Sequence, residues 1–244
     1  MTDWSKECGV ATEPDIDRFI VLVGGERIDA SFPNADFENA DYVFHDRKII
    51  IELKILETEF ESTVPFLKKE ESLHQEVAKK FGAGPILRGE RTFRKFYASR
   101  KREMYREPLG RIVKKANRQI RETKKALSLK EYRGVLWLVN DNFRQVRTDT
   151  AISLLCSCLT SANSQVRGLI YITNHYVDIA GSDFANLPWV PAYADGEADD
   201  LPDFVNWLGS EWFKFCEAEI GKFDDRRTLD DVDFLIGARP ITSS

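Results

Sequence analysis

The chain has 244 residues, of which 43% are hydrophobic, enough to bury the core of one large domain or of a domain with an insertion. It has no run of eighteen apolar residues and no apolar signal region at its start, so we expect a cytoplasmic protein without membrane segments. The net charge of −5 argues against a nucleic-acid binder, and the four cysteines have no spacing typical of a zinc or redox motif.

The first predicted element is a helix near the N-terminus. Pro14 suits the first turn of a helix, and the acidic residues beside it favour the same position. The helix is expected to end at the Gly24–Gly25 pair, and a short extended piece around Arg27–Ala30 should follow.

The segment from Asp41 to Leu56, DYVFHDRKIIIELKIL, predicts a β-hairpin. Two apolar runs, one of them rich in β-branched residues, are joined by a polar turn at 45–48. A two-residue or four-residue turn at this centre pairs Phe44 with Ile49 and, further along, Asp41 with Glu52. Because side chains alternate along a strand, one face should then carry Asp41, Val43, Ile50, Glu52 and Lys54.

That face brings two carboxylates and one ammonium group together on an otherwise apolar patch. Adjacent carboxylates repel each other unless a cation lies between them, and Mg²⁺ uses one or two carboxylates while keeping waters for a phosphate substrate. The pattern therefore indicates metal-assisted phosphodiester hydrolysis by Asp41, Glu52 and Lys54. The alternative is a solvated ion-pair cluster on a half-exposed hairpin.

The range 57–107 follows as a helical, basic insertion, with helices expected at Leu73–Phe81 and Phe93–Tyr105. From Arg88 to Lys125 there are 15 Lys and Arg residues against four Glu. Basic residues interleaved with aromatic ones suit phosphate contact and base stacking, although a solvated helix packed on the core is the alternative. The expected nucleic-acid-binding residues are Arg88, Arg91, Arg94, Lys95, Arg100, Lys101, Arg102, Lys115 and Arg118.

A further helix is predicted over Leu109–Leu127, where apolar residues recur at helical spacing. Gln119 and Thr123 lie within or beside this apolar stripe and need polar partners. Either they face the sheet that carries Asp41 and Glu52, or Gln119 is bonded to nearby backbone.

The remaining pattern predicts an α/β fold with a mixed sheet flanked by helices. Strands are expected at Gly134–Asn140 and Val166–Thr173, with a helix at Thr148–Leu159 between them. The sequence after Pro188 is read as irregular until a last helix at Phe204–Ile220.

Asp41, followed by Glu52-Leu53-Lys54 on the next strand and then by a helix and a strand, resembles the PD-(D/E)xK nuclease superfamily. The resemblance implies a restriction-endonuclease-like core in which Asp41, Glu52 and the Leu53 carbonyl hold Mg²⁺, with Mn²⁺ able to substitute, while Lys54 positions the attacking water. It also implies a supporting polar residue, for which Gln119 is the best match, and in some members a carboxylate from the first helix, here Glu13 or Asp17. Ala40 replaces the proline of the motif.

The resemblance implies a nuclease core over 13–175, interrupted by the 57–107 insertion and followed by a helical extension over 176–244 packed on the same domain. The expected function is Mg²⁺-dependent hydrolysis of nucleic acid, with DNA favoured over RNA. NADYVF, IIIELK and GVLWLVND also resemble bacterial defence nucleases, so antiviral defence as a homodimer or with a partner protein is a further expectation. The alternative is a nuclease-fold subunit that binds nucleic acid or assembles a complex without cutting.

Overall fold

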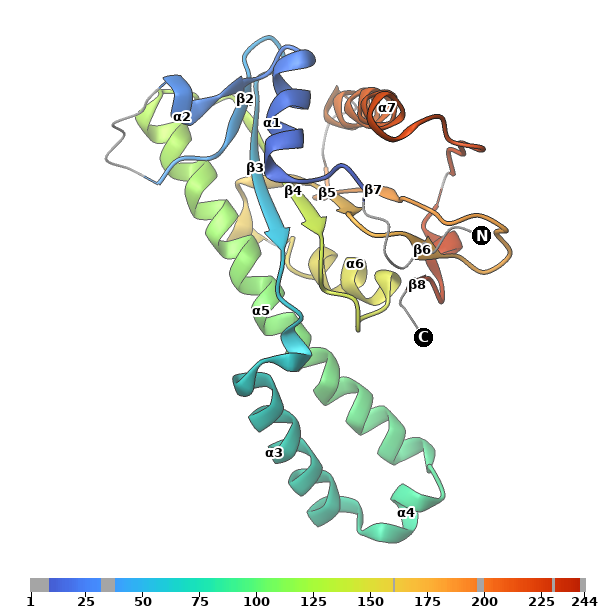
Figure 1. Cartoon of the computed structure of the whole chain (residues 1–244). Helices are drawn as coiled ribbons and strands as arrows, with labels where there is room; N and C mark the ends of the chain where they lie inside the picture. Colours follow the sequence, from blue (N-terminus) through green and yellow to red (C-terminus); the bar gives the residue numbers. More distant parts are fainter. Residues whose placement is uncertain (1–8, 32–37, 160, 197–199, 230, 242–244) are drawn as a thin grey trace.

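The computed structural model describes residues 9–31, 38–159, 161–196, 200–229 and 231–241 (Figure 1). The helices are α1 Glu13–Leu22, α2 Ile28–Ser31, α3 Val64–Phe81, α4 Ala83–Leu87, α5 Arg91–Ala126, α6 Thr148–Cys156 and α7 Asp200–Ile220. The strands are β1 Glu26–Arg27, β2 Tyr42–Phe44, β3 Ile49–Leu56, β4 Arg133–Asn140, β5 Val166–Thr173, β6 Val177–Asp178, β7 Trp189–Tyr193 and β8 Arg239–Pro240. Three short 3₁₀ turns lie at Phe60–Ser62, Ser161–Asn163 and Asp233–Leu235.

Six strands form one mixed sheet in the order β1-β2-β3-β4-β5-β7. The β3–β4 and β4–β5 pairs are parallel, whereas β1–β2, β2–β3 and β5–β7 are antiparallel. Strands β6 and β8 form a separate small sheet. The predicted α/β class, with helices flanking a mixed sheet, is confirmed.

Helices cover both faces of the sheet. Residues of α5 and α6 pack against one face, where Val43, Ile50, Leu136 and Leu138 point. Residues of α1 and α7 pack against the other face, around the fully buried Trp137. Each face therefore has its own hydrophobic core, as the alternation in the hairpin predicts.

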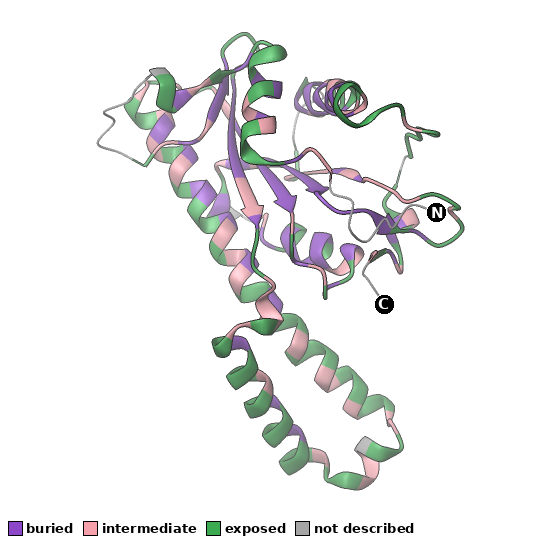
Figure 2. Cartoon of the chain, in the orientation of Figure 1, coloured by how far each residue is buried: buried purple, intermediate pink, exposed green. Residues whose placement is uncertain are grey.

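Helix α3, the short α4 and the first half of α5 form a helical arm that extends away from the sheet (Figure 1). Aromatic contacts around Phe143 anchor the arm to the body: the ring centroids of Phe60 and Phe143 are 4.9 Å apart, and those of Tyr105 and Phe143 are 6.0 Å apart. Most of the arm surface is exposed, with only a narrow buried stripe between the two helices (Figure 2).

The structure differs from the sequence prediction in three elements. The two helices expected at 93–105 and 109–127 are one continuous helix, α5, with Pro108 inside it, so the expected insertion boundary at residue 107 falls within a helix. The segment after Pro188 supplies the edge strand β7, so residues 176–244 contribute a strand to the main sheet as well as α7. The expected extended piece at 27–30 is a two-residue strand followed by the single turn α2.

Within the described ranges, no helix combines the length and apolar character needed to cross a membrane.

Candidate active site

The hairpin forms in the predicted register. Phe44 pairs with Ile49, Val43 with Ile50 and Tyr42 with Ile51. A four-residue turn joins the strands, in which the Lys48 N–H donates to the His45 carbonyl at 3.2 Å. Lys48 has a φ of 53°, the left-handed conformation that closes such a turn. The same register, continued by one pair, sets Asp41 opposite Glu52.

Asp41 lies one residue before β2 and is fixed by the backbone of β3. Its Oδ2 accepts a hydrogen bond from the Leu53 N–H at 2.7 Å. The Leu53 side chain belongs to the opposite core, so Leu53 can take part in a site on this face only through its main chain. This bond holds the Asp41 carboxylate beside the Glu52–Lys54 segment.

Glu52 is a fully buried carboxylate, with 0% of its surface exposed. One oxygen, Oε1, forms an ion pair with Lys54, while the other, Oε2, has no hydrogen-bond partner among the described residues. Burial first, and then the negative charge of Asp41, raise the pKa of Glu52 to about 8 against the opposing effects of Lys54 and Lys115. An unpaired buried carboxylate oxygen is costly unless a proton or a cation satisfies it.

Burial also raises the pKa of Asp41, although the Leu53 N–H and the charge of Lys54 lower it. The nearby carboxylate of Glu13, in the first turn of α1, acts in the same direction as burial. Both carboxylates of the hairpin are therefore poorly stabilised as anions by the protein alone. A divalent cation bound by Asp41 and Glu52 would remove this cost, and carboxylate oxygens suit Mg²⁺, so the residues fit such an ion.

Two polar side chains of α5 position the segment that enters β2. The Gln119 Nε2 group donates to the Asn39 carbonyl at 3.0 Å, and the Thr123 hydroxyl accepts from the Ala40 N–H at 2.7 Å. Gln119 is thus bonded to backbone, one of the two alternatives left open by the sequence, but this backbone leads directly into Asp41. The Gln119 Oε1 atom is buried and has no hydrogen-bond partner among the residues that the structure describes.

The other expected site residues differ in whether they act on the carboxylates of the site. Lys115, one helical turn before Gln119, is exposed and its charge acts on Glu52. Asp17 does not join the site, because it accepts from the Tyr42 hydroxyl at 2.8 Å and from Arg27 at 2.6 Å, and Tyr42 faces the opposite core. Arg118 is paired with Glu38 at 2.6 Å.

Seven further basic residues lie on the helical arm, away from the carboxylates. Arg88, Arg100 and Lys101 form ion pairs with glutamates, and Arg102 donates to the Ser153 hydroxyl at the base of the arm. Arg91, Arg94 and Lys95 form no ion pair with any residue that the structure describes.

Two features limit what can bind at the carboxylates. Across the described ranges, no three His, Cys, Asp or Glu side chains converge on one point, so a cation at Asp41 and Glu52 would need main-chain or solvent oxygens as well. The pocket of about 430 Å³ beside Val43, His45 and Leu127 lies at the turn end of the hairpin and does not include the carboxylates.

Sequence reasoning marked Thr123 as a polar residue in need of a partner, but it did not identify Ala40 as that partner. The only sequence signal of Thr123 is a polar side chain on an otherwise apolar helical stripe, and its partner Ala40 is 83 residues away.

No family model matches the chain, and neither the curated proteins nor the solved structures contain a match to it. The superfamily resemblance and the antiviral role therefore stay predictions.

Proposed function

We propose that this protein is a Mg²⁺-dependent endonuclease that hydrolyses phosphodiester bonds of DNA, built on a restriction-endonuclease-like core. The observation that carries the proposal is the buried, unpartnered Oε2 of Glu52 on the face that also holds Asp41 and Lys54. Two carboxylates with raised pKa values and an adjacent ammonium group are a costly arrangement for a purely structural strand. Perturbed groups of this kind cluster at functional sites.

The order of elements supports the same core. A helix (α1), an antiparallel meander (β1–β3), a helix (α5) and a parallel strand (β4) follow one another, with the arm inserted between β3 and the body half of α5. The two carboxylates come from the second and third strands of that meander, or from the residue next to them. This is the element order that the sequence resemblance implies.

Asp41 and Glu52, with the main chain of Leu53, would hold the cation. A bound Mg²⁺ would supply Lewis-acid stabilisation of the phosphate oxygens and lower the pKa of water. Hydrolysis adds the oxygen of water to phosphorus and breaks one P–O bond to a sugar. Side chains of the protein would position the attacking water and offset negative charge on the phosphate.

Lys54 is the side chain suited to holding the attacking water in position. Its ammonium group is paired with the buried Glu52, and its side chain is 21% exposed, so Lys54 lies between the buried carboxylate and solvent. Three N–H donors allow it to hold a water molecule and to offset negative charge that develops on the phosphate. Gln119 and Thr123 keep Asp41 in place through Asn39 and Ala40 and need not touch the substrate.

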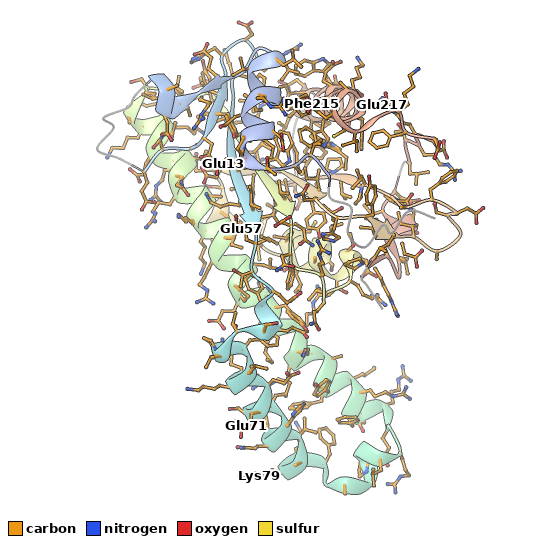
Figure 3. All side chains as sticks on the ribbon, viewed as in Figure 1. Glu13, Glu57, Glu71, Lys79, Phe215 and Glu217 are labelled. Atoms are coloured by element: carbon orange, nitrogen blue, oxygen red, sulfur yellow. The ribbon has the colours of Figure 1, made fainter. Side chains whose placement is uncertain are left out.

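The test is cleavage of supercoiled plasmid DNA by wild type, Glu52→Gln and Glu57→Gln, with Mg²⁺, Mn²⁺ or EDTA. Glu57 is an exposed carboxylate just after β3 and serves as the matched control (Figure 3). We expect metal-dependent nicking or linearisation by wild type and Glu57→Gln, none in EDTA, and a loss of at least about a hundredfold in Glu52→Gln. Cleavage by Glu52→Gln at the wild-type rate would overturn the proposal.

A second candidate function is a nucleic-acid-binding or assembly subunit that does not cut. The observation in its favour is the arm, which carries a strong positive charge and lies outside the sheet (Figure 1). This candidate has no need for a cation at Asp41 and Glu52. Binding of DNA without metal-dependent cleavage or metal-dependent stabilisation would favour it.

A further inference from the structure

The helical arm concentrates the positive charge of the chain. Residues 64–107 contain twelve Lys and Arg against six Glu, a net charge of +6 in a protein whose total is −5. The rest of the chain is therefore strongly acidic. A polyanion approaching this protein is attracted to the arm and repelled by much of the body.

The positive charges of the arm fall into two groups. Near the base and middle, acidic partners neutralise several of them: Arg100 pairs with Glu76, and Lys101 pairs with Glu61 and Glu70, whereas Lys68 forms no ion pair with a described residue. At the distal end, none of the described residues forms an ion pair with Lys79, Arg91, Arg94 or Lys95, and all four are exposed. We call these four residues the tip cluster; Figure 3 shows Lys79 near the far end of α3.

Packing between the arm helices holds the tip cluster in place. The rings of Phe81 and Phe96 are 5.4 Å apart, and the Lys80 ammonium lies 4.1 Å from the centroid of Phe96. His74 and Tyr97 stack across the two helices one turn further in. The four charges are therefore presented by a packed helical hairpin and are not on a free loop.

One continuous helix, α5, joins Arg91, Arg94 and Lys95 of the tip cluster to the candidate active site. Lys115, whose charge acts on Glu52, and Arg94 are both on α5 and are 21 residues apart. At 1.5 Å per residue this is about 32 Å, close to the ~34 Å of one turn of B-form DNA. A cation cluster at a fixed distance suits a polymer that keeps its phosphates at a fixed distance.

We propose that the arm is a ruler for double-stranded DNA: the tip cluster binds backbone phosphates about one helical turn from the phosphate at Asp41 and Glu52. A duplex is stiff over this length, whereas a single strand would have to be ordered to span it. The inference rests on the proposed function, because it takes Asp41 and Glu52 as the place of cleavage. It adds the substrate class, a duplex that extends at least about ten base pairs to the arm side of the cut.

The experiment measures binding of Glu52→Gln protein to duplexes of 8 and 24 base pairs across a range of salt concentrations. It compares the tip variant (Lys79→Ala, Arg91→Ala, Arg94→Ala, Lys95→Ala) with a control that removes charge after α7 (Lys222→Ala, Arg226→Ala, Arg227→Ala). Each lost phosphate contact should reduce the slope of log K against log salt by about 0.9. We expect the tip variant, which removes four cations, to lose about 3.6 units of slope on the 24-mer and less than one on the 8-mer, with the control unchanged.

Two further measurements separate this inference from the proposed function. A 24-nucleotide single strand, which has no fixed phosphate spacing, should show no more than a small change in the tip variant. Phosphate-ethylation interference on the 24-mer should locate the tip contacts about ten base pairs from the cut made by wild type.

Equal slopes for the tip variant and its Glu52→Gln parent, or an equal loss on the 8-mer, would overturn the ruler while leaving the nuclease intact. The same holds if the single strand loses as much slope as the DNA duplex. If wild type neither binds nor cuts duplex DNA, the proposed function and the ruler fail together.

Discussion

The hydroxyl of Thr123 accepts a hydrogen bond at 2.7 Å from the backbone N–H of Ala40, the residue before Asp41. Thr123 is fully buried in α5, and Ala40 is fully buried at the entrance to β2. The bond therefore connects the helix that covers one face of the sheet to the strand that carries the first carboxylate. It also explains why a polar residue lies on the apolar stripe of α5.

Thr123→Val should test this contact with almost no change in side-chain volume. The substitution leaves the buried Ala40 N–H without an acceptor, which should lower the free energy of unfolding by about 1–3 kcal/mol. Thr123→Ser keeps the hydroxyl and should retain more of the stability. Urea unfolding of the two variants makes the comparison, and a Val variant as stable as the Ser variant would show that the bond contributes little.

Ala40→Pro should be destabilising even though proline is the residue of the resembled motif. Proline has no N–H, so the bond to Thr123 is lost and the buried hydroxyl loses its donor. The double variant Ala40→Pro, Thr123→Val removes both partners and should be less destabilised than the sum of the single variants. Strict additivity in a double-mutant cycle would mean that the two residues are not coupled.

The pKa of Glu52 predicts an unusual dependence of stability on pH. Its pKa is about 8 in the folded protein against an ordinary value of 4.5, so the folded state binds this proton more tightly than the unfolded state. The free energy of unfolding therefore falls as the pH rises from about 4.5 to about 8. Below pH 4.5 both states hold the proton, so the contribution of Glu52 no longer changes with pH. In EDTA, the free energy of unfolding of Glu52→Gln relative to that of wild type should rise by roughly 5 kcal/mol between pH 4.5 and 8.5.

Glu57→Gln is the control for this measurement, because Glu57 is exposed. Its unfolding free energy should follow that of wild type at every pH. A Glu52→Gln variant whose advantage over wild type is the same at pH 5 and pH 8.5 would contradict the buried, proton-binding state of Glu52.

Lys54→Met should separate cation binding from cleavage. Lys54 competes with any cation for Oε1 of Glu52, so its removal should leave divalent binding unchanged or stronger. The same change removes the group proposed to hold the attacking water, and cleavage should fall by about 10²–10³-fold. Calorimetry measures cation binding and a plasmid assay measures cleavage on the same preparation. Loss of both cation binding and cleavage would make Lys54 a structural residue.

Much of the hairpin could be predicted because its signal is local. Alternation fixes which residues of 41–56 face the same side, and the short turn fixes the pairing, so Asp41 and Glu52 could be placed opposite each other. The strands β4 and β5 could be predicted for the same reason, since each is an uninterrupted apolar run between polar segments.

Elements whose signal depends on tertiary packing could not be predicted. Pro108 favours the end of a helix, but buried Tyr105 and Leu109 on either side hold α5 continuous. Pro191 argues against a strand, yet β7 pairs with β5 on one side only, and an edge strand tolerates a residue without an N–H. The contact of Thr123 with Ala40 depends on where α5 crosses the sheet, which no local pattern reveals.

Calorimetric titration of Mn²⁺ into metal-free wild type and into Asp41→Asn, with Glu57→Gln as control, is the measurement we would make first. If Asp41 and Glu52 form a cation site, wild type and Glu57→Gln should bind one ion per chain, and Asp41→Asn should lose at least about tenfold in affinity. Equal binding by Asp41→Asn, or no binding by wild type, would contradict the assignment of this face as a metal-dependent active site.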